Sequence, residues 1–289
     1  MKRQAFLRPA SWFGLVLAGS CGLASAAEWR DFSVGYRVGE RFREPFNSRD
    51  IHKDIVSFTY ASGARYGGHF FNLDLLKSDR NEPAATGSND GALEAYVAYR
   101  YTLDLGKLSG RDLQWGAVRG VGLTAGFDWN HKDDIAYNSR KHMLVLGPTF
   151  MWDVPGFLNT SLLMTHESNA PSGPFAPISQ VGSRYSYDPH PMLAVNWGIP
   201  VGSRVTFEGY ANFIAAKGRD EVGNRTGAET NIDVRVMADV GALLGMRRNA
   251  FRAGAQYQFW NNKFGNTEVA TGGQGYRAST PMLRAEFHF

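Results

Sequence analysis

The sequence predicts an all-β protein: a transmembrane antiparallel β-barrel of about 12 strands, preceded by a cleaved signal peptide. Three observations lead to this prediction. Several segments alternate apolar and polar residues with a period of two, as a strand with one lipid face and one wet face would. The connections between these segments alternate between short and long. The chain ends on an aromatic residue, Phe289, which completes one of the alternating segments.

The first 26 residues have the features of a secretory signal peptide. Lys and Arg within the first eight residues precede an uncharged stretch, and the sequence ASA at 24–26 supplies the small residues of a cleavage site. We therefore expect residues 1–26 to be removed and residues 27–289 to form the barrel. An uncleaved N-terminal anchor is the alternative, and the short stretch rich in small residues disfavours it.

The charge of the mature chain is nearly balanced. The full sequence has 31 Lys and Arg against 27 Asp and Glu, a formal charge of +4. Three basic residues, Lys2, Arg3 and Arg8, lie in the signal peptide, so 28 remain against the same 27 acidic residues. Such a balance does not favour nucleic acid as a partner. The single cysteine, Cys21, also lies in the signal peptide, so no disulfide is expected.

Five segments carry the alternation most clearly. In chain order they are ALEAYVAYRYTLD (92–104), RVTFEGYANF (204–213), NIDVRVMADV (231–240), AFRAGAQYQF (250–259) and PMLRAEFHF (281–289). A helix would space apolar residues by three and four, whereas these segments space them by two. A further strand, 119–128, places Gly120, Gly122, Thr124 and Gly126 on its inward face. This leaves room for a solute or lets the strand bend.

The lengths of the connections indicate how the barrel is oriented. Short connections are expected at 62–65, 153–157, 200–203 and 243–249, with one of middle length at 105–113. Long polar connections are expected at 39–50, 78–91, 130–140, 168–188, 216–230 and 262–279. Both termini fall on the short-turn side. Short periplasmic turns and long outer loops are typical of bacterial outer-membrane barrels, so we expect this location, with outer-membrane lipid as the surrounding partner.

Aromatic residues fit the same prediction. Phe289, with apolar residues at alternate positions before it, suits a closing strand and resembles the signal by which such barrels reach the barrel-assembly machinery. Eight aromatics near predicted strand ends are expected at the level of the lipid headgroups: Trp152, Phe157, Trp197, Tyr257, Phe259, Trp260, Phe287 and Phe289. A soluble periplasmic β-sandwich or lipocalin-like barrel is the alternative, but it explains neither the loop rhythm nor the terminal aromatic.

The inward faces of the strands indicate which solutes the lumen would accept. A pore for anions would have a basic majority, whereas mixed donors and acceptors suit small uncharged polar solutes such as nucleosides and sugars. The candidate residues are Arg37, Arg41, Phe42 and Arg43 at the mouth, and Glu94, Tyr96, Arg100, Glu208, Tyr210, Asp233, Arg235, Arg284 and Glu286 deeper in. The alternative is that these ion pairs only brace a filled lumen.

The sequence contains no clear catalytic or cofactor-binding motif. It has neither a GxSxG elbow nor a GxxxxGK[ST] phosphate loop, and its seven histidines lack metal-ligand spacing. We therefore expect a protein that is not an enzyme and that uses no metal or cofactor. His166-Glu167-Ser168, near the outer end of a strand, is the one cluster that an outer-membrane hydrolase could use.

Several stretches resemble the nucleoside-specific, Tsx-like outer-membrane channel family. They are YRVGERFREPFN, FFNLDLLKSD, YRYTLDLGKLSG, GPTFMWDVPGF, WGIP, YQFWNNKFG and PMLRAEFHF, and they cover most of the mature chain in the expected order. The resemblance implies a barrel of about twelve strands whose narrow lumen admits nucleosides. It also implies that the barrel sometimes serves as a phage or colicin receptor.

In that family an Arg-Phe pair followed by Pro lies at the end of the first strand, and the aromatic helps to bind the nucleoside. The corresponding residues are Arg41, Phe42 and Pro45, with Arg43 and Glu44 between Phe42 and Pro45. Stacking of a base on an aromatic ring contributes roughly 1–3 kcal/mol. Two alternatives remain open: this segment packs an outer loop into the barrel mouth, or the whole barrel conducts nothing and acts as a structural or receptor protein.

Overall fold

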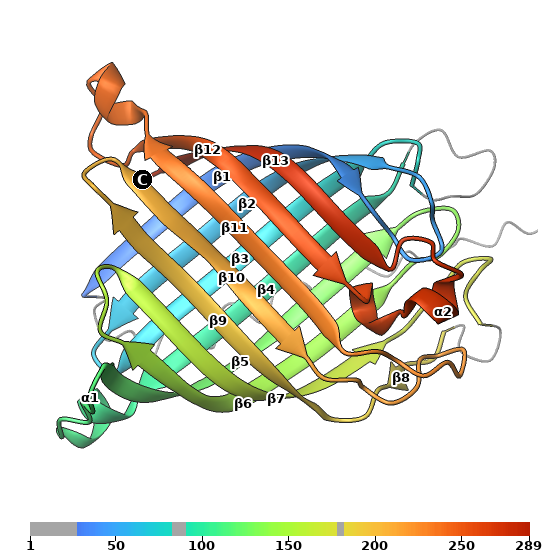
Figure 1. Ribbon diagram of the computed structural model, residues 1–289, viewed down its shortest axis with the longest axis horizontal. Coiled ribbons are helices and arrows are strands. Elements are labelled where there is room, and N and C mark those ends of the chain that lie inside the picture. The colour runs from blue at the N-terminus through green and yellow to red at the C-terminus, as the bar shows by residue number, and fades with distance from the viewer. Residues whose placement is uncertain (1–27, 83–90, 178–181) are drawn as a thin grey trace, which may run out of the picture.

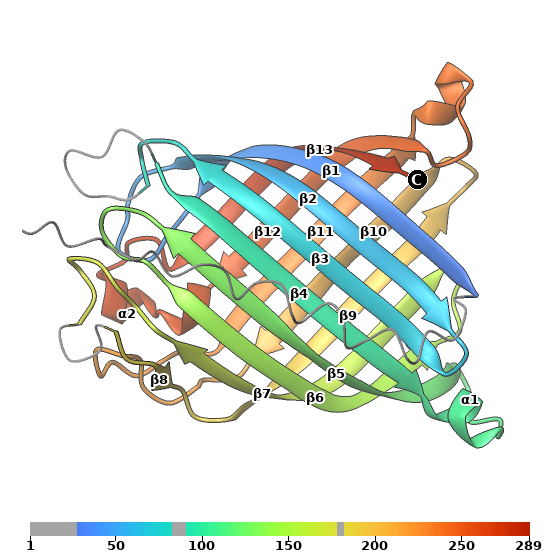
Figure 2. The same cartoon turned by 180° about the vertical axis from the view of Figure 1, so that it is seen from behind.

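Twelve strands form one closed antiparallel barrel (Figures 1 and 2). The computed structural model describes residues 28–82, 91–177 and 182–289, so the expected signal peptide lies outside the described residues. The strands are β1 (Trp29–Phe42), β2 (Ile51–Ala64), β3 (Gly67–Ser78), β4 (Leu93–Asp104), β5 (Val118–Asp133), β6 (Arg140–Trp152), β7 (Phe157–Asn169), β9 (His190–Val201), β10 (Val205–Ile214), β11 (Glu229–Asp239), β12 (Phe251–Asn261) and β13 (Arg277–His288), with the short β8 (Tyr185–Ser186) as an addition.

The first and last strands close the barrel. β1 pairs with β13 from Ser33 opposite His288 to Gly39 opposite Met282. β6 pairs with β7, and β8 extends the pairing of β7 beyond the end of β9. A closed sheet leaves no backbone edge unpaired, which hydrocarbon requires because it offers no hydrogen-bond partner. The predicted fold class and the closing role of the last strand are confirmed.

The alternation in the sequence separates a lipid face from a lumen face. On β13, Leu283 is 68% exposed, whereas its neighbours Met282 and Arg284 are 5% and 6% exposed. Large apolar side chains on the outward face of other strands, among them Phe127, Leu144 and Val236, are likewise exposed. An apolar outer wall around a charged interior is the arrangement of an outer-membrane barrel, and the protein belongs in the bacterial outer membrane.

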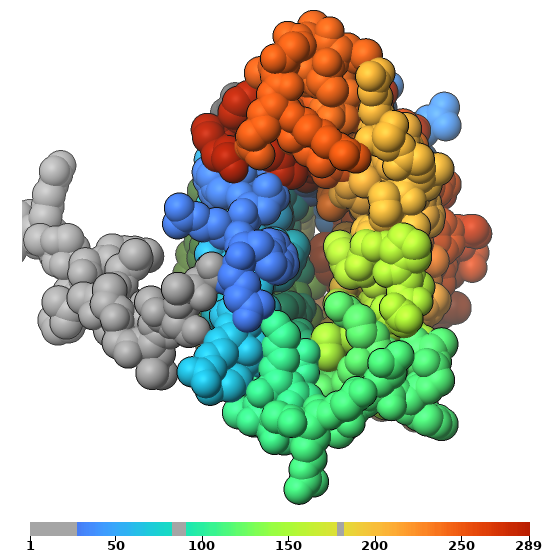
Figure 3. All heavy atoms as spheres, turned by 90° about the vertical axis from the view of Figure 1, so that its left-hand side faces the viewer, coloured from blue at the N-terminus to red at the C-terminus, as the bar shows by residue number. Residues whose placement is uncertain are grey.

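The helices are short and lie at the barrel ends. They are α1 (Leu105–Ser109), η2 (Gly241–Leu244), η3 (Lys263–Gly265) and α2 (Glu268–Thr271). None of the helices within the described residues is long and apolar enough to cross a membrane. Figure 3 looks onto the short-turn end, where η2 and α1 project on opposite sides of a narrow hollow. The long loops and α2 lie at the other end, as predicted (Figure 1).

Hydroxyl side chains fill part of the lumen beside the glycine-rich strand β5. Thr124 bonds to Thr102 at 2.8 Å and to Thr149 at 2.6 Å, and Thr149 bonds to Ser161 at 2.7 Å. The inward position predicted for Thr124 is thereby confirmed. At Gly126 an added Cβ would lie 2.1 Å from the Tyr99 carbonyl oxygen, so close approach of the neighbouring strand requires glycine here.

Leu283→Arg is expected to lower the free energy of unfolding in lipid vesicles by about 2–4 kcal/mol, because Leu283 lies in the outward apolar wall of β13. Denaturant titration of the barrel in vesicles measures this change. Leu108→Arg is the matched control, since Leu108 is exposed on α1 at the short-turn end. Equal tolerance of both substitutions would contradict the placement of the apolar wall in lipid.

Candidate functional site: the charged lumen

One group of charged residues faces the lumen from β1 to β5. Arg37 on β1 forms an ion pair with Asp74 on β3, with 2.6 Å between Nη2 and Oδ2, and donates a 2.7 Å hydrogen bond to Ser57 Oγ. In the strand register Arg37 stands opposite Arg284. Arg37 therefore lies deeper in the barrel than the mouth position expected from the sequence.

The adjoining strands β4 and β5 supply the second part of this group. Arg100 and Tyr96 both bond to Asp128, through Arg100 Nη1 at 2.5 Å and the Tyr96 hydroxyl at 2.7 Å. Glu94 accepts a hydrogen bond from the side chain of Asn130. Asp128 and Asp74 are not among the predicted residues, although both stand on the polar face of alternating stretches, GFDWN and NLDLL. The period-two pattern is the signal that identifies them.

A second group faces the lumen from β10 to β13. Glu208 accepts a hydrogen bond from Arg235 Nε at 3.0 Å and pairs with Arg252. Glu286 pairs with Arg284 and lies 3.6 Å from Arg252. Two carboxylates are thus shared among three guanidinium groups. Arg252, which is not a predicted site residue, links the two carboxylates.

Polar side chains complete this second group. Gln256 donates to Asp233 at 2.6 Å, and Gln258 donates to the Tyr210 hydroxyl at 3.3 Å. All nine residues predicted deep in the lumen therefore have polar contacts with residues on the inward face of the wall. The middle of the lumen offers donors and acceptors of both kinds, with positive and negative charges paired against each other.

The outer half of the lumen holds a cluster of buried ion pairs, here called the outer network: Glu44, Lys53, Glu82, Lys132 and Lys263. Lys53 Nζ lies 2.8 Å from a carboxylate oxygen of Glu44 and 2.8 Å from one of Glu82, and it is 3% exposed. Lys263 contacts Glu44 at 3.0 Å, and Lys132 contacts Glu82. Since Glu44, Glu82 and Lys263 belong to loops, this network ties two outer loops and η3 to the barrel wall.

Burial and charge act in opposite directions on the acids of the outer network. Burial alone would raise the pKa of Glu44, but Lys263 and Lys53 hold that pKa well below its ordinary value of 4.5. Burial also opposes ionisation of Glu82, and Lys53 and Lys132 again lower the pKa. Both acids are therefore ionised at neutral pH.

The segment η3 reaches across the mouth of the barrel. The ring of Phe264 lies 3.6 Å from Lys141 Nζ, a cation–π contact with β6, a strand on the far side of the ring of strands. Trp260 packs edge-on against Phe264 with 4.9 Å between ring centroids, and its Nε1 donates to Glu229 at 2.6 Å. Trp260 therefore lies inside the barrel, and its expected place among the headgroup aromatics is wrong.

A second buried cluster meets η3 from the opposite wall. Lys217, from the loop after β10, pairs with Glu167 on β7 at 2.6 Å. Glu221 of the same loop accepts hydrogen bonds from the hydroxyl groups of Tyr137 and Tyr187, the latter at 2.7 Å. Burial alone would raise the pKa of Glu221, but these two hydroxyls lower it. Loops from several sides thus converge over the lumen.

The remaining mouth residues do not join the polar lumen. Phe42 is 6% exposed and packs with Ile51, Ile55 and Met282 in an apolar cluster on the inward side. This is the arrangement expected if the segment packs an outer loop into the mouth. Arg41 and Arg43 line a pocket between the β1–β2 and β12–β13 loops.

The cluster His166-Glu167-Ser168 is divided between the two faces of β7. His166 is exposed on the outward side, whereas Glu167 is buried and pairs with Lys217. Ser168 accepts a hydrogen bond from Arg184 at 3.1 Å. No hydrogen bond joins His166 to Ser168 in the described part of the chain. Among the same residues, no group of His, Cys, Asp and Glu is placed to hold a metal ion.

Comparisons with known proteins support the barrel fold. No family model and no curated protein matches the sequence. Among solved structures, an outer-membrane channel from Pseudomonas putida F1 superposes with a TM-score of 0.50 at 10% identity, over 90% of this chain and 95% of that one. A KdgM porin gives 0.44 at 10% over 89% and 99%, and a NanC porin 0.45 at 11% over 90% and 99%. At such identities the likeness shows the fold alone.

Acid is expected to weaken the outer network at a pH below the usual range for a carboxyl group. The folded-state pKa values of Glu44 and Glu82 lie below 4.5. Their stabilisation is therefore complete above the unfolded-state value and is lost as pH falls through the lowered folded-state values. The free energy of unfolding in vesicles, measured from pH 7 to pH 3, should fall mainly below pH 4.5. Glu44→Gln should flatten this fall, and an unchanged slope would contradict the assignment.

Proposed function

We propose that the protein is an outer-membrane channel for passive, selective diffusion of nucleosides or similar small polar solutes into the periplasm. The observation that carries the proposal is the balanced polar wall in the middle of the lumen. Its guanidinium groups, carboxylates, amides and tyrosine hydroxyls are paired with one another, so the passage offers hydrogen bonds without a large net charge. Uncharged solutes rich in hydroxyl groups are the class that gains most from such a wall.

The contacts with solute are assigned to residues on both sides of the lumen. Arg37, Tyr96 and Arg100 lie on one side, and Tyr210 and Arg235 on the other. The same role is proposed for Glu94, Glu208, Asp233, Arg284 and Glu286. A carboxylate already bonded to a guanidinium retains lone pairs that can accept a hydrogen bond from a ribose hydroxyl. A solute can therefore bind to the carboxylate and leave it while the ion pair stays intact. No cofactor or energy source is required.

Specificity for nucleosides rests on the resemblance to Tsx-like channels. We assign Phe42 a part in solute capture at the mouth. Arg41 and Arg43 line a pocket at the outer rim, so they would meet a solute only before it enters the lumen. With Phe42 packed against Ile51 and Met282, stacking on a nucleobase requires the outer loop 43–50 to move first. An opening step of this kind would make capture depend on the outer network as well as on the aromatic ring.

A second candidate function is a closed receptor barrel, in which the outer loops bind a phage or a colicin and the lumen conducts nothing. The burial of Lys53 and Lys217 in the outer half favours it, because loops held by buried ion pairs form a stable outer surface. The two candidates differ in a single property, the passage of solute through the folded barrel.

The C-terminal strand also has a proposed partner during assembly. Phe289 is exposed and lies 5.5 Å from Phe32 and 5.0 Å from Phe287, measured between ring centroids. We propose that the barrel-assembly machinery recognises this exposed aromatic end before β13 pairs with β1.

Uptake by proteoliposomes tests the channel proposal. Vesicles that contain the purified barrel should admit radiolabelled uridine faster than a sugar of equal size, and Tyr210→Phe should reduce that preference. Tyr257→Phe is the matched control, because Tyr257 is exposed on the outward face of β12. Equal rates for both solutes would leave a general pore, and rates equal to protein-free vesicles would favour the closed receptor barrel.

A further inference from the structure

A pocket of about 520 Å³ lies at the outer rim of the barrel, outside the lumen. It is bounded by the β1–β2 loop on one side and the β12–β13 loop on the other. Three arginines line it, Arg41, Arg43 and Arg277, together with Asp50, Tyr276 and Ser279. None of the deep lumen residues described above contributes to it.

The register of β13 places this pocket on the lipid side of the wall. Arg277 and Ser279 are exposed, whereas Ala278 and Thr280 between and after them are 3% and 0% exposed and face inward. The Arg277 guanidinium lies 5.0 Å from the ring centroid of outward-facing Phe259. Below this level the outward face is apolar, as at Leu283. The pocket therefore begins where the apolar wall ends.

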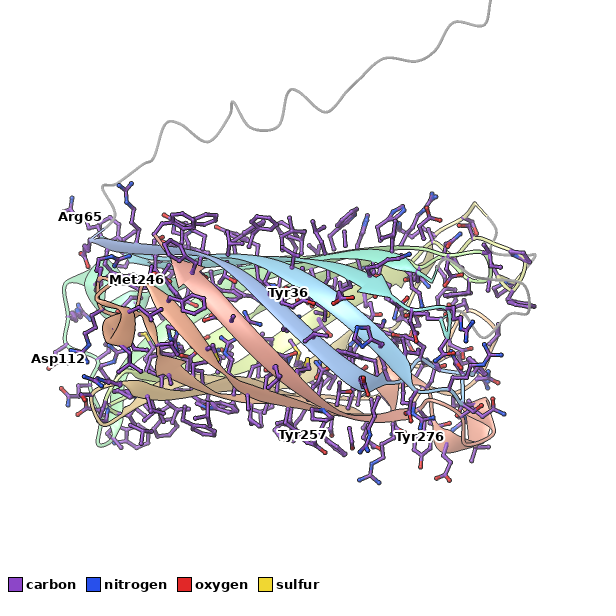
Figure 4. All side chains as sticks on the ribbon, turned by 90° about the horizontal axis from the view of Figure 1, so that it is seen from above. Tyr36, Arg65, Asp112, Met246, Tyr257 and Tyr276 are labelled. Atoms are coloured by element: carbon purple, nitrogen blue, oxygen red, sulfur yellow. The ribbon has the colours of Figure 1, made fainter. Side chains whose placement is uncertain are left out.

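Figure 4 shows the same relation along the barrel. Tyr257 and Tyr276 lie on one side of the molecule, with Tyr276 nearer the end that carries the long loops, and Arg65 lies at the opposite end. Long loops are extracellular in barrels of this class, so the pocket lies at the level of the outer-leaflet headgroups.

The pocket has an excess of positive charge. Arg43 pairs with Asp50 at 2.8 Å, but the side chains of Arg41 and Arg277 have no carboxylate partner among the residues that the structure describes. In the lumen, by contrast, Arg37, Arg100 and Arg235 all pair with acids. Three guanidinium groups and one carboxylate around a single hollow favour an anionic ligand.

We propose that this rim pocket binds a phosphate group on the glycolipid headgroup of the outer leaflet. The guanidinium fork matches two phosphate oxygens, and the Ser279 and Tyr276 hydroxyl groups add donors at the same place. Phe259 stands beside Ser279 in the strand register, and Leu283 follows two outward positions further along β13, where the acyl chains of such a lipid would run. This adjacency favours a lipid headgroup over free phosphate, which would gain nothing from an apolar neighbour.

Native mass spectrometry of the full barrel in detergent tests the proposal with diphosphoryl lipid A as the probe. The wild-type protein should retain lipid A, and the pair Arg41→Gln and Arg277→Gln should reduce the bound fraction by at least about tenfold. Arg65→Gln with Arg119→Gln is the matched control, since both residues are exposed at the short-turn end. Arg65 also stacks on an aromatic ring, that of Tyr66 at 4.9 Å.

Two further arms distinguish the sources of phosphate. Lipid A without its phosphates should bind the wild-type barrel no better than diphosphoryl lipid A binds the Arg41→Gln/Arg277→Gln variant. Inorganic phosphate at 1 mM should not displace diphosphoryl lipid A from the wild-type barrel. Equal loss in both double variants, equal binding of the dephosphorylated lipid, or displacement by inorganic phosphate would each overturn the assignment. A folded-barrel mobility shift on unheated gels confirms that every variant is assembled.

Discussion

Lys53→Met is expected to open the outer half of the lumen and to produce the largest rise in conductance of any single substitution. Lys53 holds Glu44 and Glu82, which belong to two different outer loops, against the wall at β2. Its removal takes one of two cations from each buried carboxylate, because Glu44 keeps Lys263 and Glu82 keeps Lys132. Complete loss of a buried partner costs about 3–5 kcal/mol, which is the upper bound here. The loops 43–50 and 79–82 can relieve this cost by moving into water.

Conductance in planar bilayers and denaturant unfolding in vesicles measure the two effects of Lys53→Met. Lys107→Met is the matched control, because Lys107 pairs with Glu28 at 3.1 Å while both side chains are about half exposed. An exposed pair of this kind contributes about 0–1 kcal/mol. A Lys53→Met barrel that is less stable but conducts like the wild type would show that the outer network does not close the lumen.

Neutralising the two acids of the β10–β13 group is expected to make the lumen select anions. Glu208→Gln with Glu286→Gln leaves Arg235, Arg252 and Arg284 without their carboxylate partners. Three uncompensated guanidinium groups in a narrow passage concentrate anions, and the ratio of chloride to potassium permeability should rise by on the order of tenfold.

The reversal potential in a potassium chloride gradient reports this ratio. Glu28→Gln serves as the control, since Glu28 lies at the short-turn end in the exposed pair with Lys107. A reversal potential that stays at the wild-type value in the double variant would mean that permeating ions do not pass these residues. The solute pathway proposed for the lumen would then be wrong.

The fold could be predicted because the alternation of apolar and polar residues in each strand depends on the lipid that one face meets and the lumen that the other face meets. Residues on β13 such as Leu283 and Arg284 differ in exposure as sharply as they differ in polarity, and lipid on one side imposes that difference directly. The same period-two pattern identified the deep lumen residues. It also places Asp74 and Asp128 on the inward face. It does not identify their partners on neighbouring strands, because these depend on the register between two strands, which the sequence of one strand alone does not determine.

The mouth could not be predicted in the same way. Phe264 contacts Lys141, and Lys263 contacts Glu44, only because η3 folds across the barrel. The sequence of this loop has no alternating pattern from which its path could be predicted. Trp260 was expected in the headgroup belt because it stands at a strand end, yet it faces inward beside Glu229. The alternation of side chains along β12 predicts the correct face, because the neighbouring residues Phe259 and Trp260 must point to opposite sides of the wall.

Single-channel recording of the purified barrel in a planar lipid bilayer shows whether the interior of this lipid-embedded cylinder is a pathway for small polar solutes. We expect discrete conductance steps that are weakly ion-selective and that are interrupted when uridine is added on the long-loop side. A correctly folded and inserted barrel that gives no conductance steps and no response to uridine would mean that the lumen is closed to small polar solutes.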